Sequence, residues 1–382
     1  MKLIRDRVNL YVENNKNFKG SYLCICFKRP LEKGTVTKNR LLSLVLGSGC
    51  ERYKTPTQLN SALAECNGAQ LKISSVKRGD TMVLRLLIAA PKGSEERQFA
   101  ILSEIINRPY LRADDFAVSC KKHLKNLIEN KPADKRHYAL DRCTELMFEK
   151  TAHGIDCDGI LGDLCGIKDL YGYYKSLFAN AGIDVFVLGD IDEGRAKELF
   201  DKYFPDLKTH ETPAGKAAVP CEYRAVTERL PGEHAKLCVG VDMGEGSRFE
   251  KMVFNELFYS SVLGSMKRGG LCRAITSRFY TLLNAMLVQA DIEEGDADKA
   301  VSLIKSRLEK KSTPREIDGA KAAVTHTLEL VKKYPTALMD FYLIQGILDD
   351  KVSPEKAIDK VKAVDRIDLH PRISVVYLLG SE

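Results

Sequence analysis

The sequence of 382 residues predicts an α+β protein built from two homologous halves, and three observations lead to this prediction. Each half alternates short apolar runs, typical of strands, with segments whose apolar residues recur every three to four positions, typical of helices. Each half also ends in a helix, a loop and an apolar strand that closes on Leu-Gly, at 182–189 and again at 372–380. A polar, turn-rich stretch at 205–220 separates them. We therefore expect an N-terminal domain at 1–204, a linker at 205–220 and a C-terminal domain at 221–382, each a mainly antiparallel sheet packed against helices on one face.

In the N-terminal half, the strongest local signal is a helix start. Thr55 is the expected cap, Pro56 the first helical residue and Gln58 the capping-box partner, while Asn67-Gly68 ends the helix. The expected strands of this half are Arg7–Val12, Ser21–Phe27, Ala69–Val76, Thr81–Ala89 and Asp184–Leu188. The other expected helices are Thr37–Leu46, Glu95–Asn107, Ala113–Glu129, Lys135–Phe148 and Ile167–Phe178.

The C-terminal half repeats this order in weaker form. Thr313 and Glu316 form a second capping box, with Pro314 between them, and open a long helix. The expected strands are Tyr223–Glu228, Lys236–Val241, Leu282–Asp291 and the closing strand at 372–380. The remaining expected helices are Phe249–Leu263, Ala297–Glu309 and Ser353–Val364.

Composition and charge argue against several classes of protein. Hydrophobic residues make up 44% and charged residues 29%, which is ordinary globular usage and argues against disorder and coiled coil. The net charge of +7, spread over the whole chain, is too mild to predict nucleic-acid binding. Charged residues at 1–7 stand where a signal peptide needs an apolar core. No apolar run approaches the roughly 20 residues of a membrane span.

The eleven cysteines are an odd number without repeated CxxC pairs or zinc-finger spacing, so no disulfide framework is predicted. Without an export signal, reduced thiols in the cytoplasm are the simple interpretation. Cys24 and Cys26 fall on one face of an expected strand, where we interpret them as core packing.

Four runs in the first half occur in the order of a known family: Val36–Leu46, Glu51–Pro56, Leu63–Ala69 and Lys77–Asp80. Through this order the chain resembles the pitrilysin/insulinase-like peptidases, and in particular their inactive bacterial branch, which is associated with aminopentanol modification of elongation factor P. The resemblance extends over nearly the whole chain. It implies the LuxS/insulinase-like metallopeptidase fold of two homologous domains.

Active members of this family bind zinc through an inverted H-x-x-E-H on the first helix and a Glu on a later helix. The two His share one helix face, and the Glu between them takes a proton from the metal-bound water. Aligned on Tyr53, the pattern places Arg40, Ser43 and Leu44 at the motif positions and Cys120 at the later Glu. Arg is a fixed cation, Leu has no donor atom and Ser is a poor base. The resemblance therefore implies an inactive homologue with no metal, no cofactor and no catalytic residue.

In the second half, family members often carry an Arg and a Tyr that hold the substrate backbone next to the partner's zinc. Those positions fall here on Met266 and Arg273, so the pair is not retained. Arg268 or Arg273 could still bind peptide carbonyls, and the simpler interpretation is a charged loop.

Two further groups of residues are candidate sites. His153 and Cys157, with Cys165 behind them, superficially resemble a metal-binding run, but glycines in the segment indicate a polar loop. Cys120 and His123 lie three residues apart on one expected helix, where the imidazole could orient a thiolate, although half-buried packing is the commoner role of such a pair.

Three functional hypotheses stay open from the sequence. The first is a non-catalytic subunit that pairs with an active zinc peptidase of the same fold, enclosing extended peptide for peptide processing or for modification of elongation factor P. The second is a cysteine-dependent enzyme of unrecognised chemistry, centred on Cys120 and His123. The third is a pure scaffold protein. None of them involves a membrane span or a nucleic acid.

Overall fold

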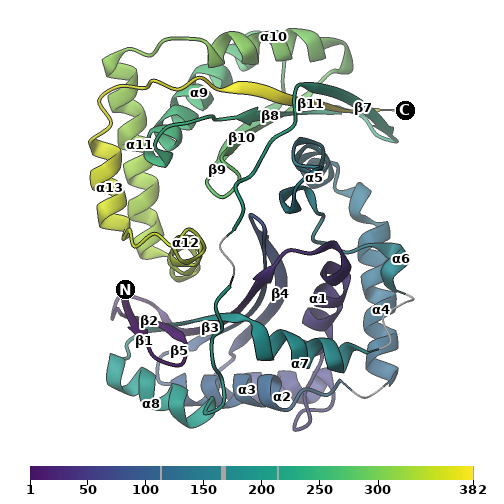
Figure 1. Ribbon diagram of the computed structural model, residues 1–382, viewed down its shortest axis with the longest axis vertical. Helices are drawn as coiled ribbons and strands as arrows, with labels where there is room; N and C mark the ends of the chain where they lie inside the picture. The colour runs from purple at the N-terminus through teal and green to yellow at the C-terminus, as the bar shows by residue number, and fades with distance from the viewer. Residues whose placement is uncertain (112–113, 165–168, 213–214, 382) are drawn as a thin grey trace. The chain divides into compact units, whose positions relative to one another are not determined.

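The computed structural model describes residues 1–111, 114–164, 169–212 and 215–381, which divide into two compact units (Figure 1). The first unit comprises Met1–Glu129, Cys157–Gly215 and Pro335–Ile347, and the second comprises Asn130–Asp156, Lys216–Tyr334 and Leu348–Glu382. Each unit has its own sheet packed with helices, which confirms the predicted fold class. These units are defined by packing, so the domain limits given above for the two halves of the sequence stay a prediction.

Six strands form the sheet of the first unit: β1 (Lys2–Arg5), β2 (Asn9–Asn14), β3 (Gly20–Pro30), β4 (Gln70–Arg78), β5 (Thr81–Pro91) and β6 (Gly182–Gly189). Their order is β1-β2-β6-β3-β5-β4, with β2 and β6 parallel and the other neighbours antiparallel. Every residue of β6 is buried, and so are most residues of β3. Both faces of the central strands are therefore covered.

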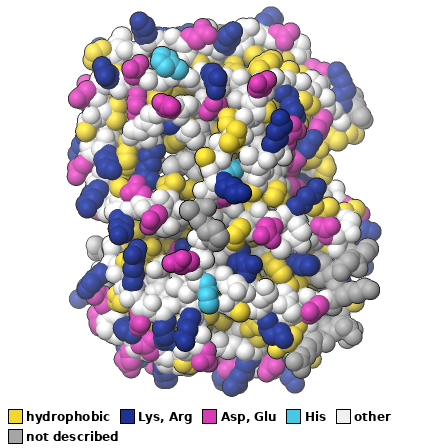
Figure 2. All heavy atoms as spheres, viewed as in Figure 1, with side chains coloured by type: hydrophobic (Ala, Val, Ile, Leu, Met, Phe, Trp, Pro, Cys, Tyr) yellow, Lys and Arg dark blue, Asp and Glu magenta, His cyan; other side chains and the backbone are white. Residues whose placement is uncertain are grey.

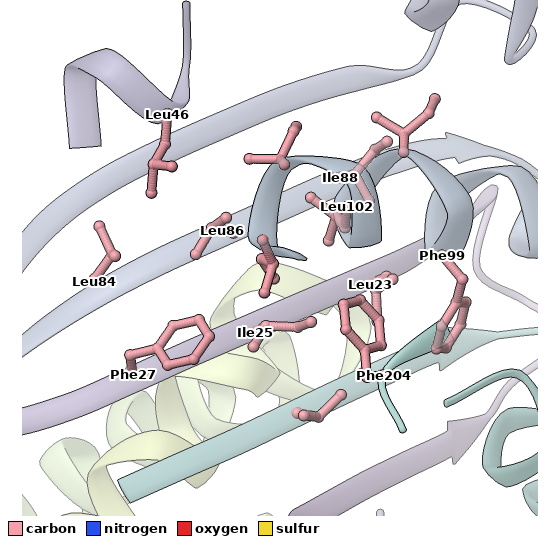
Figure 3. Close-up of a cluster of buried hydrophobic side chains, with 14 of the residues drawn as sticks. Leu23, Ile25, Phe27, Leu46, Leu84, Leu86, Ile88, Phe99, Leu102 and Phe204 are labelled. Carbon is pink, nitrogen blue, oxygen red and sulfur yellow. The ribbon is translucent and has the colours of Figure 1, made fainter. Parts of the chain in front are cut away.

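The helices of the first unit are α1 (Lys33–Leu46), α2 (Pro56–Glu65), α3 (Glu95–Asn107), α4 (Asp114–Glu129), α6 (Leu161–Leu164), α7 (Leu170–Asn180), α8 (Glu193–Tyr203) and α12 (Pro335–Ile347). Alternate residues of β3 and β5 point into one apolar core, where they meet α3 (Figure 3). Leu23, Ile25, Leu86 and Phe99 are fully buried in it. This core holds the sheet against the helices that carry the predicted site.

Five strands form the sheet of the second unit: β7 (Arg224–Leu230), β8 (Ala235–Asp242), β9 (Ala274–Tyr280), β10 (Ala285–Ile292) and β11 (Arg372–Ser381). The order β7-β11-β8-β10-β9 repeats the order β2-β6-β3-β5-β4 of the first unit. The parallel pair also recurs, because β7 runs parallel to β11 as β2 does to β6. The two strands that carry Leu-Gly at or next to their last residue, β6 and β11, therefore hold the same position in the two sheets.

The helices of the second unit are α5 (Lys135–Met147), α9 (Arg248–Arg268), α10 (Ala297–Leu308), α11 (Pro314–Lys333) and α13 (Pro354–Lys362). The predicted start of α11 is confirmed, since Thr313 and Glu316 form a reciprocal capping box. Leu237, Val239 and Val241 of β8 pack into the core on the side of α9 and α10.

One expectation is wrong, because each sheet is covered on both faces (Figure 1). In the second unit α5 packs on β8 and β11, beside Cys238 and Tyr377, on the face opposite the α9 core. In the first unit α12 packs on the sheet, where it contacts β6. Each of these helices comes from the half of the sequence that does not supply the sheet it covers. The reason is physical: strands with apolar residues at successive positions would leave one face in water if helices covered only the other.

The boundaries of most expected elements are confirmed within a few residues. The elements missed were β1, β9, α6, α8 and α12. The strand expected from Leu282 begins at Ala285, because Asn284, with φ of 50°, belongs to the preceding turn. The long helix expected from Thr313 ends at Lys333. A separate helix, α12, begins at Pro335, because proline cannot donate the hydrogen bond that would continue α11. Thr55 caps α2 as predicted, but the Gln58 side chain accepts from the backbone of Lys54. The expected helix starts at Ala113 and Ile167 lie outside the described residues.

No helix in the described ranges is both long and apolar enough to cross a membrane. On the face shown in Figure 2, basic and acidic side chains are interspersed. That distribution agrees with the mild net charge and differs from the single-sign patch typical of nucleic-acid binding.

Candidate functional site

The helix predicted to be a degenerate metal site is α1, and its three positions lack metal ligands. Ser43 is buried, and its hydroxyl donates to the carbonyl of Arg40 one turn earlier, over 2.7 Å. Leu44 is partly buried against the core of the first unit. Arg40 is half-buried, and its Nε is shielded from solvent with no hydrogen-bond acceptor among the described residues. A guanidinium, a hydroxyl turned to its own helix and an alkyl chain offer zinc no site.

Cys120, the fourth predicted position, lies on α4 and is brought next to the end of α1. Its Sγ lies 3.5 Å from Oγ of Ser48, and that hydroxyl donates to the carbonyl of Leu44 over 2.9 Å. α1 and α4 pack together along this contact. Ser48 thus links Leu44 to Cys120, a connection that the sequence pattern did not reveal because Ser48 belongs to no motif.

The edge strand β4 runs beside this helix. α1 packs on β4, and buried Asn39 donates to Oγ of Ser75 over 2.7 Å. The hydroxyl of Tyr173 on α7 donates to Asn39 over 3.3 Å, and burial raises the pKa of that phenol. In the described part of the sheet β4 pairs with β5 alone, so its other edge is free for a further strand.

The structure does not place Cys120 and His123 as the hypothesis of a cysteine-dependent enzyme requires. Cys120 is 7% exposed, whereas His123 on the same helix is exposed to solvent. The recorded partner of the Cys120 thiol is the hydroxyl of Ser48, which is no general base. Nothing in this arrangement activates the thiol as a nucleophile.

The loop around His153 is also a poor metal site. His153 is buried in a short 3₁₀ turn (Ala152–Gly154) against Phe148. The carboxylate of Asp156 accepts from Lys131 over 2.8 Å. Within the described ranges, three ligand-type atoms come together at one place, the consecutive Asp156, Cys157 and Asp158, and His153 is not among them. Cys165 lies outside the described residues.

The two arginines proposed in the second half lie at the end of α9 and in the following loop. Arg268 is the last residue of α9 and is exposed. Gly270, with φ of 64°, then turns the chain toward β9. Arg273 is exposed and lies 3.4 Å from the carboxylate of Glu293. Both side chains are accessible to a peptide, and the backbone of Arg273 is held by the carbonyl of Asp291.

Comparison with known proteins supports the resemblance seen in the motifs. A family model described as the Peptidase M16 inactive domain matches residues 166–324. The Probable inactive metalloprotease YmfF of Bacillus subtilis (strain 168) is 24% identical over 391 aligned positions, which cover 94% of this chain and 91% of that protein. In both comparisons the chain is similar to inactive members of the pitrilysin-like M16 peptidases. This confirms the predicted resemblance.

Solved structures share the fold of this chain over almost its whole length. A conserved protein from Enterococcus faecalis V583 superposes with a TM-score of 0.85 at 22% identity, covering 98% of this chain and 97% of that one. A peptidase M16 inactive domain from Pseudomonas fluorescens gives a TM-score of 0.74 at 14% identity, covering 98% and 96%. At these identities the likeness establishes the fold.

The comparisons support the prediction that this chain is an inactive peptidase homologue. The matched family model and the relative in Bacillus subtilis are both described as inactive. The side chains along α1 agree with this prediction, because the helix has no imidazole to hold zinc and no carboxylate to take a proton from water.

Proposed function

We propose that this chain is the non-catalytic subunit of a peptidase-like pair, in which a separate chain of the same fold supplies the zinc. The observation that carries the proposal is that α1 has no residue able to bind zinc or to act as the general base. The helix packs on the edge strand β4. The resemblance assigns Arg40, Ser43, Leu44 and Cys120 to the positions of an active member's zinc ligands and base, and none of these side chains is an imidazole or a carboxylate. A helix that packs in the fold but lacks the groups for catalysis fits a subunit that contributes structure to the pair and leaves the chemistry to its partner.

Extended peptide is the proposed substrate class, and β4 is the proposed contact. A free strand edge binds an incoming chain through main-chain hydrogen bonds, which select little for sequence. Arg268 and Arg273, both exposed, are proposed to donate to peptide carbonyls in the second unit. By analogy with the branch it resembles, the pair would serve peptide processing or the modification of elongation factor P. We place it in the cytoplasm, where its cysteines would stay reduced.

The pairing predicts that activity appears only in a mixture. The purified chain should hydrolyse no peptide and hold less than about 0.1 zinc per chain, because α1 has no ligands. A native pull-down should recover a chain of similar length with an intact H-x-x-E-H. Together the two should cleave unfolded peptides, and a chelator should abolish that cleavage.

Three results would contradict the pairing. Chelator-sensitive hydrolysis by the purified chain alone would make it an active metallopeptidase. Hydrolysis abolished by thiol alkylation and unaffected by chelators would favour the cysteine-dependent enzyme. If the cleavage rate of a recovered zinc peptidase does not change when this chain is added, the result would favour the scaffold hypothesis.

Peptide binding at β4 predicts a dependence on the peptide's own backbone N–H groups. An extended, unfolded peptide should bind saturably to the chain or to the pair, measured by fluorescence anisotropy. The same peptide N-methylated at four successive residues should bind at least about tenfold more weakly, because each lost main-chain hydrogen bond costs about 1 kcal/mol. A control peptide with the same side chains in shuffled order should bind equally well. Equal binding of the methylated peptide would exclude strand addition.

A further inference from the structure

Two buried thiols face each other on the sheet of the first unit, on the side covered by α12. Cys24 and Cys26 are two residues apart on β3, and their Sγ atoms lie 3.7 Å apart. Their side chains are at most 1% exposed. They point away from the apolar core that receives Leu23 and Ile25, as the alternation of a strand requires.

A guanidinium completes this cluster. Arg85 lies on β5 directly opposite Cys26, and its Nε donates to Sγ of Cys24 over 3.3 Å. Its Nη1 donates to the carboxylate of Asp340 on α12 over 2.7 Å. Asp340 also lies 3.6 Å from Arg78. The Cys24 sulfur thus has a charged donor that is itself held by an ion pair.

These contacts stabilise a thiolate on Cys24. Burial alone would raise the pKa of that thiol, but the hydrogen bond from Cys26 and the charge of Arg85 outweigh it and lower the pKa. The hydrogen bond with Cys24 and burial raise the pKa of Cys26 well above its ordinary value. Of the two thiols, Cys24 is therefore the one that loses its proton more readily.

The second unit contains a built-in comparison. Cys238 on β8 lies opposite Tyr377 of β11, three residues before Gly380. In the same way, Cys24 on β3 lies opposite Phe186 of β6, three residues before Gly189. Cys238 thus occupies the position of Cys24 in the repeat, and it hydrogen-bonds the thiol of Cys143 on α5. This hydrogen bond, burial and the charge of Asp141 all raise the pKa of Cys238. Among the described residues, no guanidinium contributes to the pKa shift of this buried thiol pair.

We propose that Cys24 and Cys26 are a peroxide-sensitive dithiol, in which Arg85 holds the attacking sulfur and α12 covers it. The Cys24 thiolate attacks one oxygen of hydrogen peroxide, forming an S–O bond as the O–O bond breaks and its electron pair leaves on hydroxide. The Cys26 sulfur then attacks the sulfenic acid. The S–O bond breaks, an S–S bond forms and the hydroxyl group leaves as water with the proton of Cys26. Two sulfurs are oxidised and one hydrogen peroxide is reduced.

The geometry permits this closure. Residues two apart on a strand have Cα atoms about 6.6 Å apart, within the range that disulfides bridge. The resolving thiol is already in contact with the attacking one. The side chain of Asp340 is 37% exposed, so solvent reaches the ion pair next to Cys24, and a local separation of α12 admits a small peroxide.

The test is treatment of the whole folded chain with hydrogen peroxide, followed by alkylation and peptide mass analysis. The peptide that contains both Cys24 and Cys26 should become about 2 Da lighter than its reduced, unalkylated form and lose both alkylation sites, and a dithiol reductant should restore them. The peptides containing Cys143 and Cys238 should stay fully alkylated over the same time. This comparison needs no substitution and so does not depend on the folding of a variant.

Variants separate the two steps. Cys26→Ser should accumulate a sulfenic acid on Cys24 that dimedone labels, and Cys24→Ser should show no labelling at this site. Arg85→Gln should slow the oxidation by about tenfold for each unit of pKa that Cys24 regains. Oxidation of the pair at 143 and 238 as fast as the pair at 24 and 26 would overturn the proposal. A persistent sulfenic acid without a disulfide in the unsubstituted chain would overturn it equally.

Discussion

The substitution Asp184→Asn is expected to lower the free energy of unfolding by about 3–5 kcal/mol. Asp184 lies on β6 with its side chain fully buried, and its Oδ2 is 2.6 Å from Nζ of Lys28 on β3, which is 9% exposed. Asn9 donates to the other carboxylate oxygen over 2.9 Å. An asparagine of the same size removes the charge and leaves the ammonium of Lys28 buried without its counter-ion. The cost is large because water cannot solvate the ammonium there.

Urea unfolding at neutral pH would measure this effect. The matched control is Asp318→Asn, whose carboxylate is 76% exposed and lies 3.6 Å from Lys321, and it should change the free energy by less than about 0.5 kcal/mol. Replacing both partners, as Lys28→Met with Asp184→Leu, should recover most of the loss, since no buried charge is then left alone. A destabilisation by Asp184→Asn no larger than that of the exposed control would show that water reaches the pair.

The second large effect is a gain of metal. Combining Arg40→His, Ser43→Glu, Leu44→His and Cys120→Glu is expected to raise bound zinc from less than about 0.1 to about one per chain. The substitutions at 40 and 44 lie one helical turn apart on α1, so both imidazoles share a face. Position 120 lies next to the end of α1 through Ser48. The measurement is metal analysis of protein purified in the presence of zinc.

A matched variant guards this result against adventitious metal. It carries Arg40→Ala in place of Arg40→His with the other three substitutions, and it should bind at least about tenfold less zinc, since the site loses one of its ligands. Circular dichroism checks that both variants fold. A folded four-fold variant that takes up no zinc would place the ancestral site elsewhere on the chain. Stoichiometric zinc in the unsubstituted protein would contradict the degenerate site itself.

Local signals predicted the local structure well. Thr55 and Thr313 cap their helices because a cap depends on the residues of one turn, all of which are visible in the sequence. The repeat was visible for a similar reason, because β6 and β11 carry the same apolar pattern ending in glycine. The missed elements had weak local patterns. β1 has only four residues. α12 follows α11 after a single intervening residue, so the apolar residues of the two helices form a pattern typical of one long helix.

Interpretation of Cys24 and Cys26 shows where sequence reasoning reached its limit. Their spacing placed both thiols on one face, and the structure confirms this. The prediction of simple core packing did not include Arg85 and Asp340, which come from β5 and α12. The residues at 24 and 340 are more than 300 positions apart, and no periodicity encodes which helix covers which strand.

By itself the sequence determined that this chain has two similar α+β halves and that its first long helix offers a metal no imidazole. Those conclusions depend on side-chain type and short-range order, which folding does not alter. Only the tertiary structure decided that α5 and α12 each cover the sheet of the opposite half, that Ser48 joins Leu44 to Cys120, and that Arg85 reaches Cys24. Such contacts arise when separate apolar faces are buried together, and many pairings of those faces satisfy the same pattern until the whole chain is packed.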